Sequence, residues 1–354
     1  MSGLCLQGSK DDTMAIDEVC ISSKLLMWLW VMLTELYVRV ASGALCIFAV
    51  FVRKGVCDTD TDMEGKTVIV TGGSSGMGKE TAKELARRKA RVIIGCCDLD
   101  EAKRAASEIF EDTRQLVVVK YLDLASFKSV RAFAKDIVAT ETRLDVLVNN
   151  AGVLLGPGSP KLTEDGYETA FQINYLGHLL LTLLLLDLLR KSAPSRVVNV
   201  ASMLHHLGNL DRFEDRARGR HPVTDPVAAY CNNKLAVVLC TRVLAEKLKD
   251  KGVTVNSVHP GVVKTPIAVN SPRVVASFFC SLQDICGKTA LQGAQTAIFL
   301  AVHPKVSRET GKYYSDCKEG WLSYKANNLK VAEDVFQASV RLLHLDDSID
   351  QLLN

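Results

Sequence analysis

The sequence predicts an α/β fold built on a doubly wound, mostly parallel sheet. Apolar, β-branched runs recur along the chain, and helical patterns lie between most of them. Parallel neighbours need crossover helices and are buried on both faces, so their strands are continuously apolar. The first run leads into a glycine-rich turn, which is typical of a ligand site at the carboxyl end of such a strand. The predicted strands cover residues 67–71, 91–96, 115–121, 144–149, 196–201, 253–258 and 312–315.

The length of 354 residues suits one enlarged α/β domain with appendages better than two equal domains. We predict a polar segment over 1–24, a hydrophobic anchor candidate over 25–54, the α/β domain over 65–345 and a C-terminal tail over 346–354. Two stretches, 208–227 and 264–288, interrupt the alternation. Both are long for structureless loops, so we expect them to carry function or extra helix.

The composition excludes several classes of partner. A net charge of +3 is too mild for a nucleic-acid surface, so we predict no nucleic acid. The eleven cysteines form no Cys-x-x-Cys pair, which favours reduced thiols in a cytosol-facing domain. No His/Cys cluster has the spacing of a zinc site, and we predict no metal.

The glycine-rich turn lies within TVIVTGGSSGMGK, residues 67–79. Three glycines remove the Cβ atoms that would hold a pyrophosphate away from the backbone, and the following helix directs its free N–H groups at it. We therefore expect a dinucleotide, bound by Gly72, Ser74, Ser75, Gly76, Met77 and Gly78. Taken alone, the pattern equally fits an ordinary glycine-bearing turn between strand and helix.

Three further side chains have the chemistry of acid-base catalysis. Ser202 ends a strand run, and Tyr230 and Lys234 follow with a four-residue offset that places both on one helix face. An ammonium one turn away favours a phenolate, so Lys234 is expected to lower the Tyr230 pKa. Tyr230 would then transfer a proton, Ser202 would hold the substrate oxygen, and Lys234 would also bind a ribose. By itself, a Tyr-x-x-x-Lys pair also arises on many surface helices.

From about residue 65 to about residue 343 the chain resembles the short-chain dehydrogenase/reductase family, with its Rossmann-type fold. Within that family it looks like the retinol dehydrogenase group, as judged from segments such as NYLGHLLLTLLLLDLL and HPGVVKT. The family motifs stand in order: Thr71 to Gly78, Asp123 in YLDLAS, Asn149-Asn150-Ala151-Gly152, Asn174 in FQINYLGH, Ser202, Tyr230-x-x-x-Lys234, and Pro260-Gly261 followed by Thr265.

The resemblance implies a catalytic tetrad of Asn174, Ser202, Tyr230 and Lys234, in which Asn174 positions a water in a proton relay. It also implies that Asp123 lies near the adenine and that Thr265 contacts the nicotinamide amide. The remaining cofactor-binding residues implied are Cys97, Asn150, Ala151, Gly152, Pro260 and Gly261. The expected enzyme is an NAD(P)-dependent oxidoreductase that acts on a hydrophobic alcohol or carbonyl. A retinoid is expected first, with a steroid or a long isoprenoid as alternatives.

The choice of cofactor is where the chain departs from the retinol dehydrogenase pattern. That pattern reads Ala-Cys-Arg-Asp after the second strand, whereas this chain has Gly95-Cys96-Cys97-Asp98 and lacks the arginine. An acidic residue that would favour NAD is also missing at Cys96. Asp98 is expected to cap the next helix. By resemblance we predict NADP, with NAD left open; Lys79 or Arg114 are candidate phosphate contacts.

The N-terminal segment is predicted to bind a membrane. A span needs roughly 17 to 25 apolar residues, and Leu36–Val52 supplies 17. Glu35 argues against a single helix across all of 25–52, and an interfacial helix or a docking hairpin remain alternatives. Arg53-Lys54 favours a cytoplasm-facing domain. Together with the resemblance, this predicts association with the endoplasmic reticulum membrane.

Three other interpretations stay open. By resemblance, the stretch 264–288 covers the substrate, and its apolar side chains Val274, Val275, Phe278 and Phe279 suit an apolar ligand, although a packed surface helix fits equally well. Helical patterns at 166–190 and 229–250 are compatible with a homodimer or with core burial. The rival functional class is a non-catalytic sensor or scaffold that binds a dinucleotide, but such relatives usually have a broken tetrad.

Overall fold

The computed structural model describes residues 55–155, 161–220, 226–263 and 287–353. The chain divides into two compact units, Met1–Val52 and Arg53–Asn354, and all described residues belong to the second. The predictions for 1–54, for Thr265 and for the apolar side chains within 264–286 therefore lie outside the described residues. Across the described ranges, no helix is both long and apolar enough to cross a membrane.

The sheet places its strands in the order β3-β2-β1-β4-β5-β6-β7-β8. Every neighbouring pair is parallel except the last, β7 with β8. This arrangement confirms the predicted doubly wound, mostly parallel fold. The strands are β1 (Thr67–Thr71), β2 (Arg91–Cys96), β3 (Val117–Tyr121), β4 (Val146–Asn149), β5 (Ser195–Val200), β6 (Val253–His259), β7 (Tyr313–Ser315) and β8 (Lys318–Glu319).

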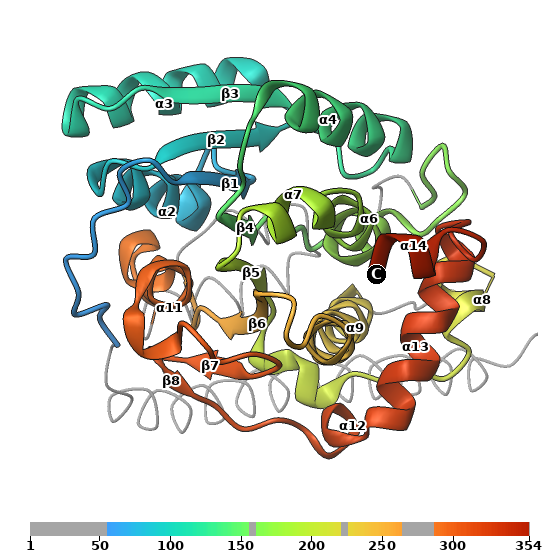
Figure 1. The fold of residues 1–354 in the computed structure, drawn as a ribbon. Helices are drawn as coiled ribbons and strands as arrows, with labels where there is room; N and C mark the ends of the chain where they lie inside the picture. The colour runs from blue at the N-terminus through green and yellow to red at the C-terminus, as the bar shows by residue number, and fades with distance from the viewer. Residues whose placement is uncertain (1–54, 156–160, 221–225, 264–286, 354) are drawn as a thin grey trace, which may run out of the picture. The chain divides into compact units, whose positions relative to one another are not determined.

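Helices cover both faces of the sheet (Figure 1). One hydrophobic cluster holds α2, α3 and α11, and the other holds α4, α6, α7, α9 and α13. The helices are α2 (Gly76–Arg87), α3 (Leu99–Thr113), α4 (Phe127–Thr140), α5 (Thr169–Phe171), α6 (Gly177–Leu184), α7 (Leu186–Lys191), α8 (Phe213–Ala217), α9 (Pro226–Lys247), α11 (Ala290–Val302), α12 (Tyr324–Asn327), α13 (Leu329–Leu342) and α14 (Ile349–Leu353). A π-helical turn, η1 (Gln172–Leu176), and two 3₁₀ turns, η2 (Met203–Leu207) and η4 (Pro304–Val306), complete the set.

The apolar strand runs are long because each strand is buried on both sides. Along β1, Ile69 packs into one cluster while Val68 and Val70 pack into the other. Successive side chains of a strand point to opposite faces, so both faces of β1 need apolar residues. The central strands are therefore fully enclosed, and only their ends are open to a ligand.

Several elements differ from the prediction in their limits. Strand β3 begins at Val117 because Arg114 takes a left-handed conformation (φ 61°) that ends α3 and leaves two linking residues. The stretch 208–227 contains the short helix α8. In the expected tail, α14 packs against the core through the buried Ile349 and Leu353.

Helix α9 is enclosed by its own chain. Its residues Cys231–Thr241 are buried, and α13 packs along it. This favours core burial over a dimer contact for the helical pattern at 229–250.

Candidate active site

The site forms where the strand order reverses. The sheet continues from β1 toward β2 on one side and toward β4 on the other. In open α/β sheets the ligand crevice lies at such a point, outside the carboxyl ends of the strands. The glycine turn follows β1 and the segment 150–152 follows β4. Ser202 comes two residues after β5, and Pro260 follows β6. The parallel sheet thus brings motifs from distant parts of the sequence to one edge.

The glycine turn has the backbone that its residues favour. Gly72 (φ 63°) and Gly76 (φ 54°) are left-handed, a conformation that side chains with a Cβ rarely adopt. A Cβ on Gly78 would lie 2.1 Å from the Gly72 carbonyl oxygen and 2.5 Å from Asn150 Nδ2. Gly78 is therefore required for the close approach of α2 to the end of β1.

The first turn of α2 is open to an anion. Ser75 occupies the N-cap position with extended backbone, its side chain makes no capping hydrogen bond, and the first turn has no acidic residue. Free N–H groups at the start of a 12-residue helix suit a phosphate. The neighbouring side chains have other contacts: Ser74 Oγ donates to Glu101 Oε2 at 2.7 Å, and Met77 packs toward Gly293 on α11. The donor set fits a dinucleotide through its backbone.

Thr71 joins the two halves of the crevice. The N–H groups of Asn150 and Ala151 donate to Thr71 Oγ1 at 2.9 and 3.0 Å. The Asn150 side chain donates back to the Thr71 carbonyl at 2.9 Å. Thr71 Oγ1 also lies 2.9 Å from Nε2 of the buried His178. The hydroxyl and the carbonyl of Thr71 together hold the segment after β4 against the end of β1.

This geometry assigns the protonation of His178. Both lone pairs of Thr71 Oγ1 accept backbone N–H groups, and the Val148 carbonyl at 3.5 Å is too distant to compete for its proton. The hydroxyl therefore donates to His178 Nε2, which places the ring proton on Nδ1, toward the Asn174 carbonyl. Burial, and secondarily the charge of Lys234, lowers the pKa of His178 to about 3, so the ring is neutral.

His178 is a residue to which the sequence assigned no role. It belongs to the FQINYLGH segment, but a histidine in an apolar helix can equally be a buried core residue with a purely structural role. Its spacing of four residues from Asn174 places the two side chains on one helix face. This spacing is the feature of the sequence that could have indicated a role for His178 at the site. His178 links the glycine turn to the turn that carries Asn174.

Asn174 lies in the π-helical turn η1, between α5 and α6. Such turns often occur at functional sites. The Asn174 amide pairs with the backbone of Val153 in both directions, because Oδ1 accepts from Val153 N at 2.8 Å and Nδ2 donates to Val153 O at 2.9 Å. Asn174 therefore fixes the course of the chain immediately after Gly152.

Lys234 and Asn174 meet at Gly152. A Cβ on Gly152 would lie 3.4 Å from Asn174 Oδ1 and 3.7 Å from Lys234 Nζ. Lys234 Nζ is buried and donates to the Val200 carbonyl at 2.8 Å. Burial lowers the pKa of Lys234 to about 8. The pKa of the Lys234 ammonium group therefore lies only slightly above neutral pH.

Tyr230 lies between Ser202 and Lys234. Lys234 Nζ is 5.4 Å from the centre of the Tyr230 ring, and Ser202 hydrogen-bonds the Tyr230 side chain closely enough to lower its pKa. Burial nevertheless raises the Tyr230 pKa well above its usual value. This differs from the expected lowering by Lys234. The ammonium group bonds the Val200 carbonyl and lies over the ring, so its charge is not directed at the phenol oxygen.

The structure also accounts for the residues around the predicted ribose site. Cys97 is exposed, whereas Cys96 is buried. Asp98 caps α3, as predicted, by accepting from Glu101 N at 2.8 Å. Lys79 Nζ is paired with Glu108 at 2.6 Å, and Arg114 ends α3 at the opposite edge of the sheet. Asp123 lies near Cys97 and raises its pKa after the larger effect of burial.

Asp123 and Gly261 are two further residues that were predicted to bind the cofactor. Asp123 lines an open cleft of about 840 Å³ beside β3 and α4. Gly261 (φ 91°) follows Pro260, and a Cβ there would lie 2.9 Å from Lys288 Nζ. Lys288 is buried and paired with Asp316.

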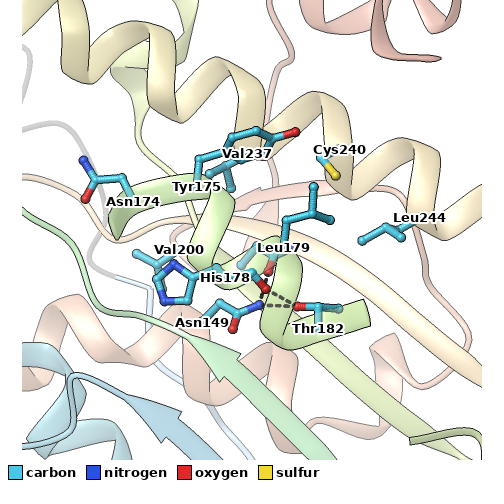
Figure 2. A pocket seen from close by; sticks show the side chains of 11 residues that line it. Asn149, Asn174, Tyr175, His178, Leu179, Thr182, Val200, Val237, Cys240 and Leu244 are labelled. Atoms are coloured by element: carbon cyan, nitrogen blue, oxygen red, sulfur yellow. Dashed lines mark hydrogen bonds between the residues drawn. The ribbon is translucent and has the colours of Figure 1, made fainter. Parts of the chain in front are cut away.

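A small cavity of about 20 Å³ is lined by Asn174 and Tyr175 of η1 (Figure 2). It is large enough for about one water molecule. Asn149 Nδ2 donates to Thr182 Oγ1 at 2.9 Å, while Asn149 Oδ1 has no hydrogen-bond partner. The cavity is too small for the predicted substrate. Within the described ranges, no three His, Cys, Asp or Glu side chains gather as a metal site would require.

The fold and this arrangement of motifs define a nicotinamide-dependent oxidoreductase. A family model described as short chain dehydrogenase matches residues 66–212, and one described as Enoyl-(Acyl carrier protein) reductase matches 216–303. The chain belongs to the short-chain dehydrogenase/reductase family, and it is an NAD(P)-dependent enzyme.

Individual relatives indicate a subgroup within this family. Retinol dehydrogenase 12 of Bos taurus is 46% identical over 297 residues, which cover 83% of this chain and 91% of the relative. Retinol dehydrogenase 11 of Homo sapiens is 43% identical, over 82% of this chain and 90% of the relative. These matches confirm the predicted resemblance to the retinol dehydrogenase group.

Solved structures of the same fold include NADP complexes. An uncharacterised protein from Mycobacterium paratuberculosis has a TM-score of 0.64 at 30% identity, covering 80% of this chain and 95% of its own. The Pseudomonas aeruginosa RhlG/NADP active-site complex has a TM-score of 0.57 at 26% identity, covering 72% and 95%. A nicotinamide dinucleotide is therefore the cofactor class.

Proposed function

We propose that this protein interconverts a retinoid-type alcohol and carbonyl, with NADP(H) as the preferred cofactor. The observation that carries the proposal is the position of Tyr230 between Ser202 and Lys234, at the sheet edge that also holds the glycine turn. The identity of 46% with a retinol dehydrogenase supports the substrate class.

Within this proposal, the cofactor is held mainly by backbone. The N–H groups at the start of α2, with Gly72 and Gly76, take the pyrophosphate, and the segment Asn150–Gly152 lines the opposite wall. Pro260, Gly261 and Thr265 are proposed at the nicotinamide end, and Asp123 at the adenine end. The bound nicotinamide supplies or accepts the hydride.

The side chains handle the proton. In reduction, the Tyr230 hydroxyl donates its proton to the substrate oxygen, which Ser202 holds by a hydrogen bond. Lys234, with a pKa of about 8, is proposed to bind ribose and to return a proton toward Tyr230. Asn174 is proposed to support the relay by fixing the chain at Val153, beside Gly152.

The substrate is tested with a panel of carbonyl compounds. Purified full-length protein in detergent is given NADPH or NADH with all-trans-retinal, a 3-ketosteroid or a long isoprenoid aldehyde. We expect the highest kcat/KM with retinal. A steroid or isoprenoid preferred by tenfold would replace the retinoid assignment, and tight cofactor binding without turnover of any carbonyl would favour a sensor.

The preference for NADP is tested by titration. Because Cys97 is exposed and no arginine stands there, the wild-type preference is expected to be modest. Cys97→Arg should tighten NADPH binding by about tenfold relative to NADH, since a bidentate guanidinium suits a phosphate. At least tenfold tighter NADH binding by the wild-type protein would overturn the preference.

We also propose that residues 25–52 attach the protein to the endoplasmic reticulum membrane, with the α/β domain on the cytoplasmic side. The apolar composition of the segment and the Arg53-Lys54 pair that follows it support this. The full chain should sediment with microsomes and remain sensitive to added protease, whereas a chain without residues 1–54 should stay in the supernatant. Sedimentation of the shortened chain would contradict the anchor.

A further inference from the structure

We propose that a patch of exposed apolar side chains beside the active site docks on a lipid bilayer. The patch, called here the aromatic patch, consists of Met203, Leu207, Trp321, Tyr324 and Leu329. The inference deepens the proposed function, on which it rests, because it names the source from which a hydrophobic substrate enters.

The exposure of these side chains is unusual. Tyr324 and Trp321 are 90% and 89% exposed, and Leu207 is 72% exposed. Single exposed apolar residues are ordinary, but a contiguous group that includes a tryptophan marks an interaction surface. Trp and Tyr are the residues that prefer the boundary between lipid and water, because each ring is apolar and has one polar group.

The residues lie on two segments that run side by side. Ser323 N donates to His205 Nε2 at 3.3 Å, and Lys325 Nζ donates to the Gly208 carbonyl at 3.0 Å. These bonds bring the segment of Trp321 and Tyr324 onto η2, which carries Met203 and Leu207. The aromatic patch therefore combines residues more than a hundred positions apart.

The segment is held in place by its own chain. Gly320 N donates to the Tyr313 carbonyl at 2.7 Å, and Ser323 caps α12 by accepting from Ala326 N at 3.1 Å. Ala326 is fully buried and its carbonyl accepts from Arg242. The exposed rings thus project from a fixed support.

The aromatic patch borders the reacting residues. Met203 directly follows Ser202, and its N–H donates to His259 Nδ1 at 3.2 Å, one residue before Pro260. A bilayer that contacts Met203 and Leu207 would lie next to the opening of the crevice. An apolar substrate could then pass from lipid to the site without crossing water.

The start of the described chain favours a bilayer as the occupant. Gly55 N donates to Asp316 Oδ1 at 3.3 Å, and Cys57 N donates to Gln295 Oε1 at 2.9 Å. Asp316 lies in the turn between β7 and β8, five residues before Trp321, which limits their separation to about 18 Å. The described chain therefore begins near the segment that carries Trp321, and the 54 residues before Gly55 include the apolar stretch 25–52 that is proposed to bind a membrane. In Figure 1, this start lies near α11 and β8, and β8 leads to α12.

The surrounding charge also suits a membrane. Lys318, Lys325 and Lys330 are exposed on the same segment. The nearby Glu319 is paired with Lys312 at 2.9 Å. Lysines close to an anionic bilayer are attracted to its surface. The aromatic patch therefore has both the apolar groups and the flanking cations of an interfacial surface.

The first test uses Trp321 as a probe in the full-length protein. The chain has three tryptophans, so Trp28→Phe/Trp30→Phe leaves Trp321 alone. This variant is reconstituted into vesicles of phosphatidylcholine and phosphatidylserine with brominated acyl chains. We expect at least a twofold loss of Trp321 fluorescence from lipid bromine, and protection from aqueous acrylamide. Absence of bromine quenching overturns the proposal, and so does protection that rises with protein concentration alone, which would indicate a second copy.

The second test measures function. Trp321→Ser/Tyr324→Ser should raise KM for vesicle-dissolved retinal at least fivefold, while kcat and the NADPH Kd stay unchanged. Leu116→Ser is the matched control, because Leu116 is 80% exposed but lies between α3 and β3. An unchanged KM, or an equal loss with a water-soluble aldehyde, overturns the proposal. Failure of the wild-type enzyme to reduce retinal would instead reject the proposed function, and the fluorescence result would still decide the docking.

Discussion

Thr71→Val tests whether the Thr71 hydroxyl holds the segment after β4 against the end of β1. Valine has nearly the shape of threonine, so the main change is the loss of Oγ1. That oxygen accepts from Asn150 N and Ala151 N and bonds His178 Nε2, at 2.9, 3.0 and 2.9 Å. A polar group left without its partner costs about 1–3 kcal/mol when buried, and the two backbone groups are half-exposed. We expect a total loss of about 2–4 kcal/mol.

The matched control is Thr71→Ser, which keeps the hydroxyl and removes one methyl group, worth about 1 kcal/mol. Thermal unfolding of both variants is followed by intrinsic fluorescence. At roughly 2 °C per kcal/mol for a domain of this size, the midpoint should fall by roughly 4–8 °C for the valine variant and by about 2 °C for the serine variant. NADPH titration should show binding weakened about tenfold only in Thr71→Val, because the segment 150–152 loses its support. Equal behaviour of the two variants would refute the role of the hydroxyl.

Further predictions concern the glycine turn and acid stability. Gly78→Ala should lower the free energy of unfolding by about 1–3 kcal/mol and weaken NADPH binding, because the new Cβ would lie 2.1 Å from the Gly72 carbonyl oxygen. In Gly152→Ala the nearest contact of the new Cβ would be 3.4 Å, so this variant should lose less than 1 kcal/mol in urea unfolding. Burial lowers the pKa values of His178 and His259 to about 3 in the folded protein. As the pH falls below about 6.5, these histidines therefore take up protons in the unfolded chain before they do so in the folded one. The free energy of unfolding should decrease from pH 6.5 toward pH 4. His178→Gln should reduce that slope by up to about 1.4 kcal/mol per pH unit, and an unchanged slope would show that His178 is already charged in the folded protein.

Much of the fold follows from local patterns in the sequence. The runs that became β1, β2, β5 and β6 are apolar on both faces, and that pattern has one common structural solution when helices separate the runs. Strand β8 could not be found in this way, because two residues are too few to show a period of two. Helix α14 is set by burial of Ile349 and Leu353 against a core whose other members lie far away in sequence.

The site was predictable in its membership and less so in its interactions. Motif spacing predicts Ser202, Tyr230 and Lys234, and the sheet brings them to one edge. It does not predict that Lys234 donates to the Val200 carbonyl, which depends on how α9 lies against β5. For the same reason the sequence gives no indication that Gly78 faces the Gly72 carbonyl or that His178 bonds Thr71.

The most direct test of the central claim is single-turnover reduction of all-trans-retinal by NADPH, comparing full-length wild-type protein with Tyr230→Phe. We expect the wild-type protein to form retinol in step with NADPH loss. Tyr230→Phe should lose at least a hundredfold in rate, since general acid catalysis contributes about 10²–10⁴-fold, while the NADPH Kd changes less than twofold. A variant that retains turnover within tenfold of wild type, or a wild-type protein that binds NADPH tightly but forms no retinol, would contradict the account.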